Sequence, residues 1–127
     1  AARCGTDEPV PFGHFRKSRL RTMTDKIVVL TTCGSEEEAR SLARGLVGRR
    51  LAACVSVTGG ITSVYRWQGE VQEESERLLL IKTRRDLFDE LRTEIQRLHS
   101  YEVPEIIALP VVDGSGAYLG WLDKELA

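Results

Sequence analysis

The sequence predicts an α+β domain in which two helices connect the strands of a single sheet. Two segments carry apolar residues at helical spacing, and they alternate with short β-branched runs that are typical of buried strands. Between the two helices, two long extended segments flank a short glycine-containing turn, which indicates a β-hairpin. The chain has 127 residues, of which 42% are hydrophobic and 29% charged, so its size and composition suit one globular domain.

The first strand and helix are predicted from local patterns. Residues 27–32 form a β-branched run that suits a buried strand. Ser35 stands three residues before Glu38, the spacing of a capping box, so a helix is expected to begin there. Apolar residues within 39–47 then recur on one helical face, and residues 48–50 (Gly-Arg-Arg) mark the helix end.

The central segment predicts an unusually long hairpin. Residues 51–57 are expected as the second strand, and Gly59-Gly60 predicts a bulge or sharp bend before the chain continues extended to Trp67. A turn at 68–70 leads into the third strand, expected over 71–83. The distal half of this hairpin is polar and aromatic, so a single copy of the chain would bury it poorly.

The remaining elements complete the order strand-helix-strand-strand-helix-strand. A second helix is expected over 85–100 with Thr83 as its cap, then a fourth strand over 105–109 that Pro110 ends or places at an edge. Residues 117–126 predict a short C-terminal helix or a segment that clasps a partner. This order is that of a ferredoxin-like βαββαβ sandwich. Both helices would cover one face of the sheet. The other face would be left largely uncovered in a single copy, which predicts self-association.

Composition and charge exclude several classes of protein. Eighteen Lys+Arg against nineteen Asp+Glu give a net charge of −1, which provides no general attraction to nucleic acid or anionic membranes. No segment has the ~18–20 consecutive apolar residues of a membrane-spanning helix. The inner strands carry no aromatic platform for RNA bases. Three widely spaced cysteines without a CxxC motif predict a reducing, cytoplasmic environment.

The N-terminal residues are assigned to a different part of the protein from the rest of the chain. Residues 1–25 are predicted to be a disordered leader or extension, and residues 26–127 the folded domain. The leader lacks the apolar core of a secretory signal. Met23 is the only methionine and directly precedes the first apolar run. We therefore expect translation of the native protein to start at Met23, with residues 1–22 as an added extension.

Three residues are candidate metal ligands: Cys33, His99 and Glu102. Cys33 follows the first strand, where a helix N-terminus would lower its pKa, or it simply fills the corner as a small apolar residue. His99 either interacts with the end of a helix or acts as a ligand beside Tyr101 and Glu102. Imidazole, thiolate and carboxylate together bind borderline divalent ions. His99 has no evident acid or thiol partner at a spacing that predicts catalysis, so no enzyme is expected.

The hairpin and third strand supply candidate interface residues. Tyr65, Arg66 and Trp67 suit a buried contact between subunits, or stacking on a ligand. Lys82 either extends its stem along apolar surface or directs its charge into a cleft between subunits. The acidic residues of the hairpin form a solvated face in the simplest interpretation: Glu70, Glu73, Glu74 and Glu76.

Six separated segments resemble the CutA divalent-cation-tolerance family. They are IVVLTTC (27–33), LAACV (51–55), VYRWQGEV (64–71), LLLIKT (78–83), HSYEVPE (99–105) and YLGWL (118–122). The resemblance spans about residues 26–126. It implies a ferredoxin-like homotrimer whose hairpins wrap neighbouring subunits, as in PII signalling proteins. It also implies cytoplasmic occurrence in bacteria and binding of copper or other divalent ions, with no firmly assigned reaction.

The resemblance also directs attention to particular residues. The family motifs persist at His99, Tyr101, Trp67 and Lys82, whereas a copper-binding member has a cysteine where this chain has Thr31. We therefore expect weak binding of copper or another divalent cation through His99, with Cys33 and Glu102 as co-ligands. Two alternatives are a PII-like module that binds a small anionic metabolite near Lys82, Arg66 and Trp67, and a trimeric scaffold for a partner protein.

Overall fold

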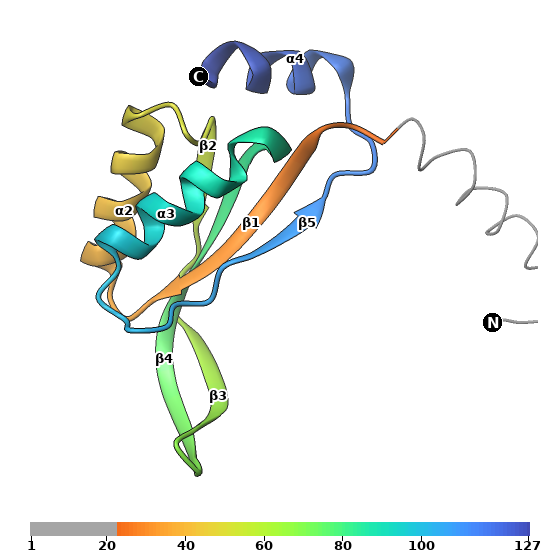
Figure 1. Ribbon diagram of the computed structural model, residues 1–127. Helices are drawn as coiled ribbons and strands as arrows, with labels where there is room; N and C mark the ends of the chain where they lie inside the picture. Colours follow the sequence, from red (N-terminus) through yellow and green to blue (C-terminus); the bar gives the residue numbers. More distant parts are fainter. Residues whose placement is uncertain (1–22) are drawn as a thin grey trace, which may run out of the picture.

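The computed structural model describes residues 23–127, and the predicted extension over residues 1–22 lies outside this part of the chain. An antiparallel sheet has the strand order β2-β4-β1-β5, and β3 pairs with the distal half of β4 (Figure 1). The strands are β1 (Lys26–Cys33), β2 (Cys54–Val57), β3 (Ile61–Trp67), β4 (Glu70–Arg84) and β5 (Ile107–Pro110). The chain is therefore a mixed α+β domain, as the sequence predicts.

Two helices, α2 (Glu36–Gly48) and α3 (Phe88–Leu98), pack on one face of the sheet. Alternation along β1 and β4 directs Val29 and Ile81 toward these helices, where both are fully buried with Leu91 and Ile95. The C-terminal helix α4 (Gly116–Glu125) lies at one end of the sheet, where Leu122 packs in a smaller apolar cluster. None of the helices among residues 23–127 is long and apolar enough to cross a membrane.

The start of α2 confirms the capping box, because the Ser35 hydroxyl accepts a hydrogen bond from the Glu38 N–H at 3.1 Å. The predicted strand over 51–57 is too long. Residue Arg50 adopts a left-handed φ of 61° after the helix, and the N–H groups of Leu51 and Ala52 both bond back to the Leu46 carbonyl. These turn bonds engage the N–H groups of Leu51 and Ala52. The first backbone N–H that bonds to β4 is therefore that of Ala53, which donates to the Lys82 carbonyl at 3.0 Å, and β2 begins at Cys54.

Thr83 is not a helix cap, contrary to the prediction. It is fully buried in β4, and its hydroxyl donates to the Leu51 carbonyl at 2.7 Å. A short 3₁₀ turn, Arg85–Leu87, precedes α3, and neither element has a side-chain cap. The predicted helix over 85–100 is thus split at its start and ends at Leu98, with His99 as its C-cap.

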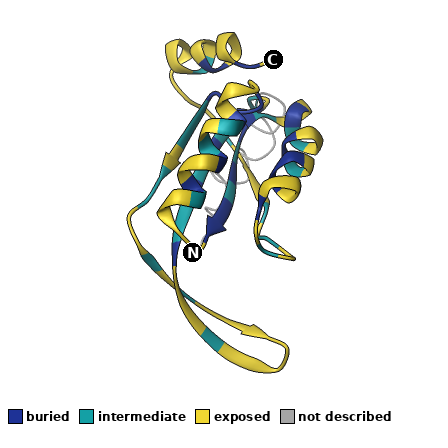
Figure 2. Cartoon of the chain, turned by 90° about the vertical axis from the view of Figure 1, so that its left-hand side faces the viewer, coloured by how far each residue is buried: buried dark blue, intermediate teal, exposed yellow. Residues whose placement is uncertain are grey.

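The long hairpin carries the predicted bulge. Val57 pairs with Leu79 and Ile61 with Glu76, so the three residues 58–60 lie opposite the two residues 77–78. At the tip, Gln68 and Gly69 have φ values of 52° and 83°, the left-handed pair of a tight hairpin turn. The distal hairpin projects away from the helices and is largely exposed (Figure 2).

The two ends of the domain differ slightly from expectation. Strand β5 starts at Ile107, two residues later than predicted, and Pro110 ends it at the sheet edge. The Thr24 hydroxyl donates to the Val111 carbonyl at 2.6 Å, and the Arg85 N–H donates to the Asp25 carbonyl at 2.7 Å. Residues 24 and 25, assigned to the extension by the sequence, therefore belong to the folded domain.

Candidate functional site

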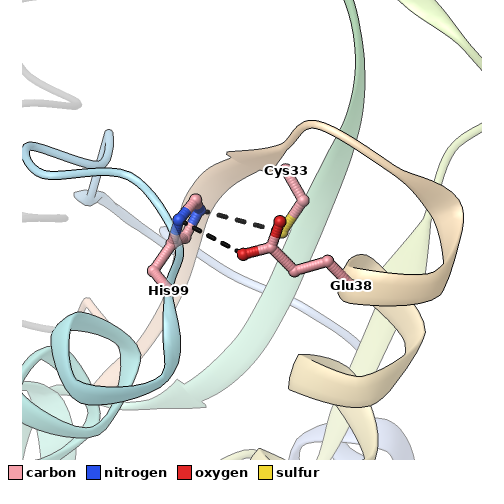
Figure 3. Close-up of side chains that lie close together, drawn as sticks. All are labelled: Cys33, Glu38 and His99. Atoms are coloured by element: carbon pink, nitrogen blue, oxygen red, sulfur yellow. Dashed lines mark hydrogen bonds and ion pairs between the residues drawn. The ribbon is translucent and has the colours of Figure 1, made fainter.

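Cys33, Glu38 and His99 come from three different elements and meet at one end of the sheet (Figure 3). Cys33 ends β1, Glu38 lies in the first turn of α2, and His99 caps α3. One potential ligand atom from each lies within 4.8 Å of the others. The Cys33 Sγ is 3.8 Å from His99 Nε2, and a Glu38 Oε2 is 3.6 Å from His99 Nδ1.

The hydrogen bonds around His99 indicate which of its ring nitrogens accepts and which donates. The Tyr101 N–H donates to Nδ1 at 3.0 Å, so Nδ1 is an acceptor in this network. The ring proton is therefore assigned to Nε2, which lies 2.6 Å from the Thr32 carbonyl oxygen. The side chain is completely buried. Through these two hydrogen bonds, His99 joins the end of β1 to the loop after α3.

Cys33 is a protonated thiol at neutral pH. Burial raises its pKa to about 12, and the negative charges of Glu38 and Glu76 add to this effect. The lowered pKa expected at a helix N-terminus is therefore wrong, because burial and two carboxylates outweigh the helix dipole. Fully buried and packed in the core, Cys33 also fills the corner as the alternative reading predicted.

The donor set of this cluster fits a borderline divalent ion in type and proximity. An imidazole nitrogen, a thiol sulfur and a carboxylate oxygen are ligands used by copper and zinc. Cys33 must lose its proton to bind a metal ion, and a ligating Nε2 must give up its contact with Thr32. Both costs oppose the binding of a metal ion, and the cost of removing the Cys33 proton falls as pH rises.

Glu38 takes the place that the sequence analysis gave to Glu102. The Glu38 carboxylate accepts hydrogen bonds from the Ser100 N–H at 2.8 Å and the Ser100 hydroxyl at 3.1 Å, which hold it beside His99. Sequence reasoning assigned Glu38 only to the capping box. That motif uses its backbone N–H here, so the carboxylate remained available for a distant partner. Glu102 lies elsewhere, on the wall of a cavity.

A cavity of about 730 Å³ lies between the distal hairpin and the loop that contains Tyr101. The predicted residues Tyr65, Trp67, Tyr101 and Glu102 line it. Glu76 also lines it and is only 6% exposed, and its Oε2 accepts a hydrogen bond from the Tyr101 hydroxyl at 2.7 Å. Burial, the bond to Glu76 and nearby negative charge all raise the pKa of Tyr101. Sequence analysis had interpreted Glu76 as part of a solvated face.

Lys82 and Arg66 do not line this cavity. Lys82 Nζ donates to the Ser56 hydroxyl at 2.7 Å and to the Cys54 sulfur at 3.7 Å, both on β2. Arg66 donates to the Gly69 carbonyl at the hairpin turn at 3.2 Å. A single chain therefore does not bring Lys82, Arg66 and Trp67 together as one anion-binding site.

Comparison with known proteins assigns the family. The model of the CutA1 divalent ion tolerance protein family matches residues 27–125. This chain belongs to the CutA1 family. A CutA1 relative from Thermus thermophilus, named a divalent-cation tolerance protein, is 55% identical over 95 residues, which cover 75% of this chain and 92% of the relative.

Other CutA1 proteins are similar in sequence and structure. The chloroplastic CutA protein of Arabidopsis thaliana is 49% identical over 96 residues, but this chain spans only 53% of its length. The solved structure of CutA1 from Thermus thermophilus matches with a TM-score of 0.78 and 51% identity over 80% of this chain and 99% of that chain. CutA1 from Oryza sativa matches with a TM-score of 0.80 and 43% identity over 84% and 97% of the two chains.

Proposed function

We propose that this CutA1 chain is a non-enzymatic protein that binds a divalent cation, copper or another borderline ion, weakly at Cys33, Glu38 and His99. The convergence of three different donor atoms within 4.8 Å carries this proposal. Membership of a family named for divalent ion tolerance supports the class of ligand. In this role the protein buffers or senses metal ions in the cytoplasm.

We further propose a homotrimer of ferredoxin-like subunits with a PII-like assembly. The sheet face opposite the helices supports self-association, because it presents apolar side chains that α2 and α3 do not cover. Val28 and Leu80 are half-buried there, whereas Ile107 and Leu109 on β5 remain 49% and 48% exposed. The distal hairpin has apolar residues that need a partner in the same way. Sedimentation of a stable monomer at micromolar concentration would contradict this assembly.

Calorimetric titration with copper and zinc tests the metal site. His99→Ala and Glu38→Gln should each weaken binding by about tenfold or more, because each removes one donor. Glu102→Gln is the matched control, since it makes the same charge change outside the cluster and should leave the affinity unchanged. Binding should strengthen as pH rises, because the Cys33 proton must be released. Equal affinities for wild type, His99→Ala and Glu38→Gln would refute the site.

The lining of the cavity beside Trp67 does not favour the binding of an anionic metabolite. Its lining includes Glu74, Glu76, Glu102 and Glu105 and no lysine or arginine from residues 23–127. Negative potential of this kind repels anions. The PII-like resemblance therefore supports the proposed assembly and not an anionic ligand in this cavity.

A further inference from the structure

The proposed metal cluster is open to solvent at only one of its three side chains. Cys33 and the His99 side chain are completely buried, whereas 23% of the Glu38 side chain is exposed. Glu38 reaches from α2 toward His99 (Figure 3). A metal site requires a path by which the ion enters. Glu38 is therefore the member of the cluster that an ion from solvent can contact first.

Tyr101 closes the side of the cluster that faces the distal hairpin. Its ring packs against the His99 imidazole, with 4.7 Å between the ring centroids. The Tyr101 hydroxyl donates to the Glu76 carboxylate at 2.7 Å, and the Tyr101 N–H donates to His99 Nδ1 at 3.0 Å. The ring also fits closely over the residue after Cys33, since a Cβ on Gly34 would lie 3.3 Å from the Tyr101 hydroxyl. Entry from this side would require Tyr101 to leave all of these contacts.

Glu38 also lines a groove of about 570 Å³ between α2 and α3. Glu37 and Ser41 on α2 and Leu98 on α3 line the same groove close to Glu38 in the sequence or across the helix pair. The groove lies on the helix side of the sheet. The proposed subunit contacts involve the opposite face and the distal hairpin, so the proposed assembly leaves this groove open.

The charges along the groove favour a cation at the Glu38 end. At the other end, Arg49 and Arg97 each place a guanidinium nitrogen 2.6 Å from the Glu94 carboxylate. Along a helix Arg49 lies about 16 Å from Glu38, at roughly 1.5 Å per residue, which exceeds the Debye length of about 8 Å in physiological salt. Glu37 forms no ion pair within the described residues 23–127. The negative potential of Glu37 and Glu38 therefore attracts a divalent cation to this end.

We propose, on the basis of the metal site proposed above, that a divalent ion reaches the cluster along the groove between α2 and α3. Glu38 is its first ligand, and Cys33 and His99 bind it next. The Glu38 carboxylate is suited to this role because its hydrogen-bond donors are the N–H and hydroxyl of Ser100, which is exposed. Water can replace both donors when the carboxylate turns toward an arriving ion.

Stopped-flow mixing with cobalt(II) tests the route, because the cobalt–thiolate absorption band reports the arrival of the ion at Cys33. The pair Cys4→Ser and Cys54→Ser leaves Cys33 as the only thiol. In this background, Ser41→Trp places an indole in the groove beside Glu38. It should lower the association and dissociation rate constants about tenfold and change the Kd by less than about twofold, because an obstacle on the path slows both directions equally.

Gln96→Trp is the matched control, since Gln96 is exposed on α3 and does not line the groove, and its rates should be unchanged. A second pair tests the charges. Glu37→Gln should lower the association rate constant about threefold at low ionic strength and by less as salt is added. Glu90→Gln, exposed on α3 and outside the groove, should leave it unchanged.

The outcomes separate the route from the site. Absence of the cobalt–thiolate band would refute the metal site and the route together. A normal band with unchanged rates in Ser41→Trp and Glu37→Gln would overturn the route and leave the site intact. Slower association in Glu102→Gln, on the hairpin side of Tyr101, would also overturn the route, because the ion would then enter past Tyr101.

Discussion

The two halves of β4 share one extended backbone but differ in what covers them. Leu79 and Ile81, near its C-terminal end, are fully buried between β1, β2 and the helices. Toward its N-terminal end the strand pairs only with β3, and Val71 remains 63% exposed. Backbone pairing alone therefore maintains a strand without burying it. The proximal half belongs to the core of the domain, whereas the distal half is largely exposed in a single chain.

The largest expected effect on stability is the difference between truncating a side chain in the buried half of β4 and truncating one in its exposed half. Leu79→Ala should lower the free energy of unfolding by about 2–5 kcal/mol, because it removes a fully packed side chain. Val71→Ala should change it by less than about 0.5 kcal/mol in a single chain. Guanidinium unfolding at several protein concentrations measures both. A larger, concentration-dependent loss in Val71→Ala would show that assembly covers the hairpin, as the proposed trimer requires, whereas a large loss that does not depend on concentration would contradict the contrast between the two halves.

A buried hydrogen bond tests the same difference between the buried and the exposed parts of the sheet. Thr83→Val removes the hydroxyl that donates to the Leu51 carbonyl and leaves that acceptor without its partner. The expected loss is about 1–3 kcal/mol of unfolding free energy. Thr62→Val is the matched control, since Thr62 is exposed on β3 and solvent replaces any lost bond. Similar losses in both variants, measured by thermal unfolding, would contradict a role for the buried bond.

The third prediction depends on pH and concerns charge in the buried half. The pKa of Cys33 is about 12 in the fold and 9.0 in its absence, so the unfolded chain loses this proton first. Stability should therefore fall as pH rises between about 9 and 12, by at most ~1.4 kcal/mol per pH unit from this group. In Cys33→Ala that part of the slope should disappear, whereas Cys54→Ala should retain it. Denaturant titrations from pH 8 to 11 compare the slopes.

Local signals predicted local features well. Ser35 and Glu38 fix the start of α2, and Gly59-Gly60 marks the bulge, because both depend on neighbours in the chain. Thr83 was misread because the same residue type serves as a helix cap or as a buried donor. Which of the two roles Thr83 takes depends on the position of the Leu51 carbonyl, which is 32 residues away in the chain. Family resemblance supplied the class of protein, which the match over residues 27–125 confirms.

The sequence by itself determined the order of the elements, the length of the hairpin and the family, since periodicity, turn residues and motifs are all written along the chain. Only the tertiary structure decided that Glu38 rather than Glu102 joins Cys33 and His99, and that Glu102 instead faces an acidic cavity. The reason is physical: a carboxylate acquires its role from the charges and donors packed around it. Those neighbours come from strands, helices and loops that only folding brings together.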